Sequence, residues 1–106
     1  MAWRKGYSGE YKAKQELEAE YPDCDVIKIA IAQIGADFMV IYYGRLLLLV
    51  EVKETTHNHY YPNIKEKKQF TRIIEFALIH NCKAELWIYY KQGHGKLTIK
   101  EVKSLN

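Results

Sequence analysis

The chain has 106 residues, of which 48% are apolar and 27% are charged, and this is typical of one globular domain spanning residues 1–106. The longest apolar run, Leu46 to Val50, is far too short to cross a bilayer, which excludes a membrane-spanning helix. The net charge of +3 permits a nucleic-acid partner without requiring one.

The first predicted element is a helix from Ser8 to about Glu20, a stretch rich in Glu, Lys, Ala and Gln. Tyr21 and Pro22 end it, because a proline disfavours helical backbone at the residue before it. Helical spacing places Glu10 on the stripe that should turn inward. One carboxylate is therefore expected on the inner face of this helix.

Three strands are predicted next. They span Asp25–Ala32, Ala36–Tyr43 and Leu46–Lys53, and Gly44 supplies the turn between the second and the third. The third strand is apolar on both faces, which is typical of a strand that is covered on both sides. We therefore expect it at the centre of the sheet.

The second half of the chain opens with a polar loop, Glu54–Asn63, and continues as a helix over Ile64–His80. Apolar side chains repeat along this helix at i, i+3, i+4, i+7 and i+8, and they should form core: Phe70, Ile73, Ile74, Ala77 and Leu78. Two strands follow, Lys83–Tyr90 and Lys96–Val102. The order αβββαββ predicts an α/β fold with a mixed five-stranded central sheet flanked by helices.

Two cysteines, Cys24 and Cys82, stand far apart and lack the spacing of a metal knuckle or a redox pair. They suit reduced thiols of an intracellular protein. The N-terminal residues carry no apolar signal segment, so we expect a cytoplasmic protein.

The strongest chemical pattern lies on the second and third strands. If Tyr43, Gly44 and Arg45 connect the two strands, counting back from the turn places Asp37 directly opposite Glu51. Opposed residues of antiparallel strands point to the same side, with Cβ atoms about 5 Å apart. Lys53 shares this face with Glu51, because side chains two apart on a strand do so.

Two carboxylates at the end of an apolar surface repel each other, and burial makes their ionisation costlier. A divalent cation relieves this repulsion, and Mg²⁺ prefers carboxylate oxygens while it keeps several waters. Together with an ammonium group such a site suits phosphodiester hydrolysis. The alternative is a surface salt bridge of Lys53. The same tripeptide recurs as Glu101, Val102 and Lys103 without an acidic partner upstream, so the tripeptide alone is a weak signal.

With these residues the chain resembles the PD-(D/E)XK nuclease superfamily, and more closely the archaeal Holliday junction resolvases and their viral relatives. The resemblance runs through most of the chain. It is carried by Arg4, Lys5 and Gly6 before Glu10, by Gly35–Asp37, by Val50–Lys53, by Arg72–Ala77 and by Ala84–Tyr90. It implies a restriction-endonuclease-like fold.

The resemblance also implies roles for individual residues. Glu10, Asp37, Glu51 and Lys53 would be catalytic. Asp37, Glu51 and the backbone carbonyl of Val52 would ligate Mg²⁺, with Mn²⁺ as a substitute, and Glu10 would contact the ion through water. The family works as a homodimer that nicks a four-way junction at two symmetric positions.

One departure concerns an Arg and a Ser that the family usually carries before the acid motif. This chain has Lys28 in place of the Arg, and a lysine cannot make the same forked contact with a phosphate. It has no Ser in this stretch.

Contacts with DNA are predicted for basic, aromatic and amide side chains. His57 and His59 lie in a loop, where exposure or contact with DNA is expected rather than metal ligation. The full set is Arg4, Lys5, Lys28, His57, His59, Tyr60, Lys65, Lys67, Lys68, Gln69 and Arg72.

The sequence thus favours a metal-dependent endonuclease that resolves four-way junctions. Two alternatives stay open. One is a related repair or nicking endonuclease that acts on other branched or duplex DNA. The other is a DNA-binding protein on a decayed nuclease scaffold.

Overall fold

The computed structural model describes residues 8–91 and 97–106. Its elements follow the predicted order, and they are α1 (Gly9–Glu20), β1 (Asp25–Lys28), β2 (Phe38–Tyr42), β3 (Arg45–Thr55), α2 (Ile64–Ile79), β4 (Lys83–Lys91) and β5 (Leu97–Ser104). The five strands form one sheet in the order β1-β2-β3-β4-β5. Only the β3–β4 pair is parallel among them, so the sheet is mixed and β3 is its central strand, as predicted.

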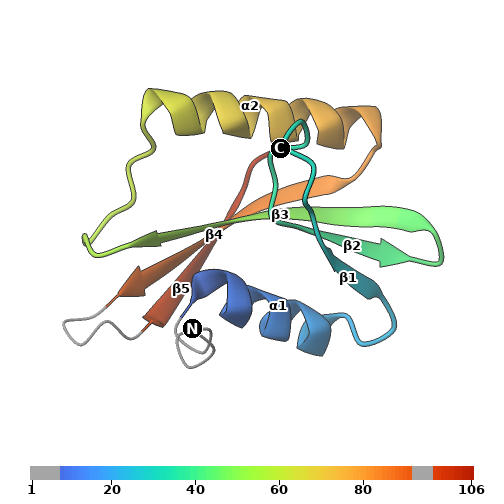
Figure 1. The fold of residues 1–106 in the computed structure, drawn as a ribbon, viewed down its shortest axis with the longest axis horizontal. Coiled ribbons are helices and arrows are strands. Elements are labelled where there is room, and N and C mark those ends of the chain that lie inside the picture. The colour runs from blue at the N-terminus through green and yellow to red at the C-terminus, as the bar shows by residue number, and fades with distance from the viewer. Residues whose placement is uncertain (1–7, 92–96) are drawn as a thin grey trace.

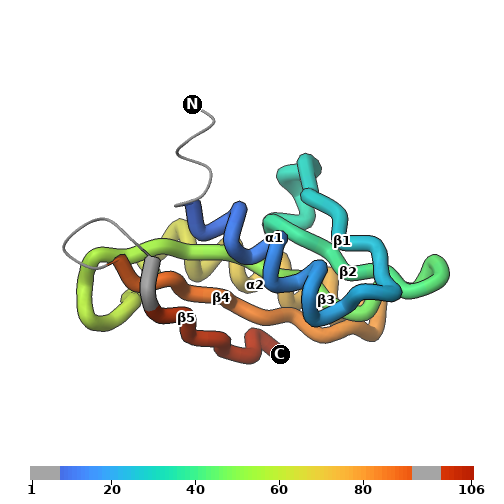
Figure 2. The backbone as a smooth tube through the Cα atoms, turned by 90° about the horizontal axis from the view of Figure 1, so that it is seen from below, coloured from blue at the N-terminus to red at the C-terminus, as the bar shows by residue number. Residues whose placement is uncertain are grey.

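The two helices cover opposite faces of the sheet. Figure 1 shows α2 above the sheet and α1 below it, and Figure 2 shows α1 on the near side with α2 behind. α2 is the crossover that a parallel β3–β4 pair requires. Within the described residues, neither helix is long and apolar enough to cross a membrane.

Each face of β3 contributes to a separate core. Leu48, Val50 and Val52 face α1, where they pack with Leu17, Phe38 and Trp87. Leu49 faces α2 and packs with Phe70, Ile73, Ala77 and Ile88. Because side chains alternate along a strand, Glu51 joins Leu49 on the α2 side. The prediction that Leu78 belongs to the core is wrong, since 68% of it is exposed.

The β2–β3 hairpin differs from the prediction at its turn. Tyr42 pairs with Arg45, so the connection is the two-residue turn Tyr43–Gly44, in which both residues have positive φ. A bulge then follows, because Ile41 pairs with Leu46 whereas Val40 pairs with Leu48.

The extra residue in this bulge is Leu47, which has no opposing residue on β2. The shorter turn moves the pairing by one position, and the bulge moves it back. The last pair before the site is Phe38 with Val50. Counting one step further therefore still sets Asp37 against Glu51.

β1 is shorter than predicted and ends at Lys28. Ile29 lies beyond the strand, but its backbone N–H still donates to the Asp37 carbonyl at 2.8 Å. The chain then leaves the sheet, and Ile31, which was predicted as part of this strand, is exposed beyond its end. The segment returns at Gly35, whose φ of +84° suits glycine.

Candidate active site

Glu51 is the most deeply buried charged side chain among the described residues, with 3% of its surface exposed. Its Oε2 atom accepts a hydrogen bond from Gln69 Nε2 at 2.7 Å and lies 3.1 Å from Lys53 Nζ. Its Oε1 atom is buried and accepts no hydrogen bond from the described residues. Since buried polar atoms are normally satisfied, this oxygen is available for a ligand.

Asp37 precedes β2 and is tied to β3 at two points. Its backbone N–H donates to the Val50 carbonyl at 2.9 Å, and its Oδ2 accepts from the Val52 N–H at 2.7 Å. The predicted proximity of Asp37 and Glu51 is confirmed. Burial raises the pKa of Glu51 to about 8, and the negative charge of Asp37 acts in the same direction.

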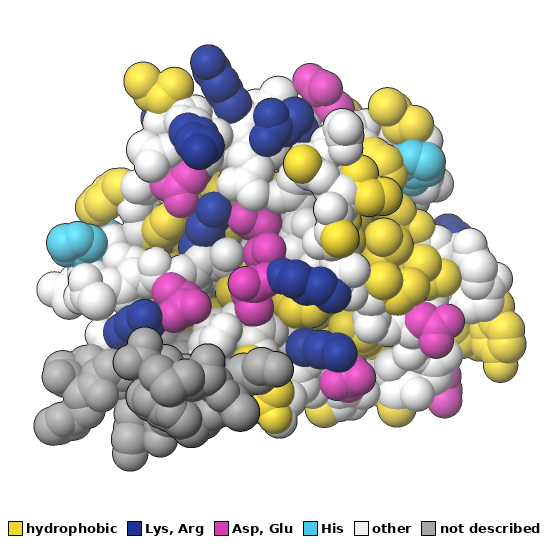
Figure 3. Space-filling view, in the orientation of Figure 1, with side chains coloured by type: hydrophobic (Ala, Val, Ile, Leu, Met, Phe, Trp, Pro, Cys, Tyr) yellow, Lys and Arg dark blue, Asp and Glu magenta, His cyan; other side chains and the backbone are white. Residues whose placement is uncertain are grey.

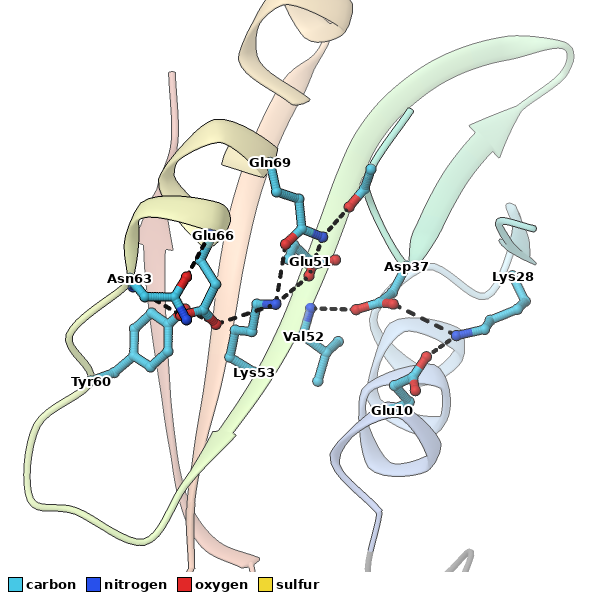
Figure 4. Close-up of polar contacts among 11 residues, drawn as sticks. Glu10, Lys28, Asp37, Glu51, Val52, Lys53, Tyr60, Asn63, Glu66 and Gln69 are labelled. Carbon is cyan, nitrogen blue, oxygen red and sulfur yellow. Dashed lines mark hydrogen bonds and ion pairs between the residues drawn. The ribbon is translucent and has the colours of Figure 1, made fainter. Parts of the chain in front are cut away.

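Lys53 is held by three side chains. Its Nζ lies 3.1 Å from Glu51 Oε2 and 3.5 Å from Glu66 Oε2, and it donates to Gln69 Oε1 at 3.2 Å. Figure 4 shows these contacts converging on the ammonium group. A lysine with three partners has a fixed orientation.

Glu66 was missing from the sequence-based site. It begins α2 in a capping box, in which Asn63 Oδ1 accepts from the Glu66 N–H and Glu66 Oε1 accepts from the Asn63 N–H. Its other oxygen accepts from the Tyr60 hydroxyl at 2.8 Å and faces Lys53. Burial opposes its charge, but these hydrogen bonds and Lys53 together lower the pKa of Glu66. The Asn-x-x-Glu spacing was the available signal for this residue.

Gln69 joins three parts of the site. Its Nε2 donates to the Gly35 carbonyl at 2.6 Å and to Glu51, while its Oε1 accepts from Lys53. The sequence suggested Gln69 as a DNA contact, whereas the structure places it against the acidic groups. It therefore serves as a positioning residue that fixes the loop before β2, Glu51 and Lys53 together.

Among residues 8–91 and 97–106, Lys28 is what connects Glu10 to this cluster. The Lys28 ammonium forms an ion pair with Glu10 and lies 3.7 Å from Asp37 Oδ1 (Figure 4). The two residues come from β1 and the first turn of α1. Sequence reasoning placed Glu10 on an inner face but did not predict its pairing with Lys28.

The acidic groups fit a hydrated divalent ion. In the described part of the chain, no three carboxylate, imidazole or thiol side chains converge on one point. Mg²⁺ needs less, because it commonly uses one or two carboxylates and keeps its other ligands as water. The unpartnered Oε1 of Glu51 and the nearby Asp37 meet that need. Metal ligation by the Val52 carbonyl and a water-mediated contact between Glu10 and the metal stay predictions.

The other expected DNA contacts fall into three groups. Lys65, Lys67, Lys68 and Arg72 are exposed on α2, the upper element in the space-filling view of Figure 3. His57 and His59 are exposed in the loop after β3, whereas the Tyr60 hydroxyl is bound to Glu66. Arg4 and Lys5 lie outside the described residues.

Comparisons with known proteins inform the fold. No protein-family model matches the chain, and no curated protein sequence matches it. The structure is similar to that of Archaeoglobus fulgidus Hjc, a Holliday junction resolvase from an archaeal hyperthermophile, with a TM-score of 0.57 and 16% identity. The match covers 86% of this chain and 74% of that one.

The chain has the fold of this resolvase. The likeness to archaeal Holliday junction resolvases predicted from the motifs is thus confirmed at the level of the fold, and so is the predicted fold class.

The raised pKa of Glu51 predicts how stability changes with pH in the absence of metal. Between about 4.5 and about 8 the folded state holds a proton that the unfolded chain releases, so stability falls as pH rises. The slope is at most about 1.4 kcal/mol per pH unit. Urea unfolding with EDTA at about pH 5.5, 7.0 and 8.5 measures it.

The variant Glu51→Gln should lose this part of the slope, because an amide does not titrate in this range. Glu75→Gln, at an exposed position of α2, is the matched control and should keep the wild-type slope. Identical slopes for Glu51→Gln and wild type would contradict the assignment.

Replacing Gln69 by Ala should lower the free energy of unfolding by about 1–3 kcal/mol, because the Gly35 carbonyl and Glu51 lose a donor. Gln33→Ala, at an exposed position, should change it by less than about 0.5 kcal/mol. Chemical denaturation compares the two variants. Equal stabilities would mean that Gln69 holds nothing in place.

Proposed function

We propose that this protein is a metal-dependent DNA endonuclease that cleaves branched DNA, preferentially four-way junctions. The observation that carries this proposal is the site itself. A buried carboxylate with a free oxygen lies beside a second carboxylate, and an oriented lysine lies 3.1 Å from the first. Nothing in the packing of the sheet requires this arrangement, whereas phosphodiester hydrolysis does.

The metal would be Mg²⁺, with Mn²⁺ as a substitute. Asp37 and Glu51 would hold it, together with the Val52 carbonyl, and Glu10 would contact it through water. When bound, such an ion lowers the pKa of a water molecule and stabilises charge on the phosphate oxygens.

The protein residues supply orientation and charge. Lys53 faces the acidic groups, and Gln69 and Glu66 keep its ammonium group from turning away. This ammonium group would bind the scissile phosphate or the attacking water and would stabilise the negative charge that develops there. The products would be a 5′-phosphate and a 3′-hydroxyl, as the resemblance implies.

DNA would approach over the face that carries the acidic groups. Lys65, Lys68 and Arg72 follow one another at i, i+3 and i+7, so they share one flank of α2. Exposed lysine and arginine side chains bind phosphates and give affinity without reading sequence. A homodimer would present two such sites, which suits paired nicks in a symmetric junction.

The four-way junction is the favoured substrate because the fold matches that of a protein described as a Holliday junction resolvase. One observation favours the related alternative, a repair or nicking endonuclease. Lys28 stands where the family usually has Arg, and here it is engaged with Glu10 rather than free for a phosphate. A decayed, purely DNA-binding scaffold is disfavoured, since the two acidic groups and the lysine still converge.

Two substitutions test the site. Asp37→Asn should reduce cleavage by more than about a thousandfold and leave junction binding nearly intact, because the carboxylate acts on the metal and not on DNA. Lys53→Met should reduce cleavage by about a hundredfold or more. Gel assays of cleavage and of binding in Ca²⁺ measure both.

The second Glu-Val-Lys tripeptide provides the control. Lys103 is the last residue of this tripeptide and is exposed on the edge strand β5. The variant Lys103→Met should therefore cleave DNA at the wild-type rate. Normal cutting by Asp37→Asn would refute the site assignment.

The substrate is tested with a synthetic four-way junction, a flap and linear duplex, each with and without Mg²⁺. We expect cleavage only with Mg²⁺ and fastest on the junction, at two symmetric positions. Equal cutting of all three DNAs would refute the resolvase assignment while keeping the nuclease. No cutting of any DNA in Mg²⁺ or Mn²⁺ would refute the nuclease itself.

A further inference from the structure

Lys28 occupies an unusual position at the end of β1. Its ammonium group is paired with Glu10, lies 3.7 Å from Asp37 Oδ1 and lies 5.2 Å from the centroid of the Phe38 ring. Figure 4 shows the side chain reaching between the two carboxylates from the side opposite Lys53. One positive charge is therefore shared by two acidic residues of the site.

The two oxygens of Asp37 have different roles. Oδ2 accepts from the Val52 N–H at 2.7 Å, whereas no hydrogen bond from a described residue to Oδ1 is found. Oδ1 is also the oxygen that faces Lys28. An ammonium group and a divalent ion repel each other at this range, so the charge of Lys28 lowers the affinity of Asp37 for a divalent ion.

We propose that Lys28 is a resident counter-cation of this site, which competes with the divalent ion for Asp37 and thereby weakens metal binding in the absence of DNA. This inference rests on the metal-dependent function proposed above. It concerns a residue for which the sequence suggested only a phosphate contact.

The Lys28 ammonium group can move away from Asp37 while the backbone of β1 stays in place. Its backbone is fixed by pairing with Phe38, but 52% of its side chain is exposed and its four-carbon stem is flexible. The side chain can therefore remain on Glu10 when Asp37 takes up a metal ion. The competition therefore lowers the affinity for the metal ion, while the ion pair with Glu10 and the contact over the Phe38 ring can stay in place.

The test measures Mn²⁺ binding by isothermal titration calorimetry without DNA. We expect Lys28→Met to bind Mn²⁺ more tightly than wild type by roughly threefold to tenfold, since a competing charge is removed from a half-exposed site. Lys28→Arg keeps the charge and should bind Mn²⁺ about as weakly as wild type. Unchanged or weaker binding by Lys28→Met would overturn the proposal.

Lys100 provides a matched control. It also reaches from a strand to α1, where it pairs with Glu16 at 2.6 Å, and its ammonium lies 3.9 Å from the centroid of the Trp87 ring. Lys100→Met removes the same kinds of contact away from the acidic cluster. Its Mn²⁺ affinity should equal that of wild type, and an increase matching that of Lys28→Met would overturn the proposal by pointing to net charge alone.

A second measurement uses the wild-type protein and does not depend on a variant that folds. The ε-methylene signals of Lys28 in a ¹H–¹³C NMR spectrum should shift during a Mg²⁺ titration and saturate together with binding. Signals that stay in place while Mg²⁺ binds would overturn the proposal.

The result is separable from the proposed nuclease. Cleavage of junction DNA with equal Mn²⁺ affinity of wild type and Lys28→Met refutes the role of Lys28 alone. Tighter binding by Lys28→Met without cleavage of any DNA supports the role of Lys28 and refutes the nuclease. Absence of metal binding to wild type and Lys28→Met alike refutes both.

Discussion

The buried carboxyl group of Glu51 is the constraint around which the rest of the site is arranged. A carboxylate on the covered face of a central strand is costly unless its oxygens are satisfied. Gln69 and Lys53 satisfy one oxygen, and the other is left without a partner among the described residues. The neighbouring Asp37 adds to the cost rather than relieving it. The core between the sheet and α2 must therefore offset the cost of burying Glu51, a side chain that suits ligand binding better than packing.

The fold was predictable because its signals are local and repeated. The apolar period of Ile64–His80 and the doubly apolar Leu46–Lys53 gave a helix and a central strand that the structure contains as α2 and β3. The register of Asp37 and Glu51 was predicted correctly although the turn was not. A three-residue connection was expected, and the structure instead has a two-residue turn and a bulge at Leu47. The alternation of apolar and polar side chains fixes which residues pair near Asp37 and Glu51. It does not distinguish a three-residue connection from a two-residue turn followed by a bulge.

What the sequence could not predict are contacts between elements that are distant in the chain. Glu66 was visible only as the end of an Asn-x-x-Glu cap, and its second contact with Lys53 depends on where α2 lies over the sheet. The pairing of Lys28 with Glu10 depends in the same way on how α1 crosses β1. β1 was overestimated because alternating isoleucines resemble a strand, while the backbone of Ile29–Ala32 leaves the sheet to reach Gly35.

The bulge at Leu47 has a practical consequence for the far end of the hairpin. It separates the tip from the pairs between Val40 and Leu48 and between Phe38 and Val50, which keep the acidic residues in register. Residues added between Tyr43 and Gly44 would lengthen the exposed turn and leave these pairs in place. The tip projects from the sheet, with Tyr43 almost fully exposed. It is the natural place to attach a fluorophore or an affinity tag while the chemistry at the other end of the strands is left untouched.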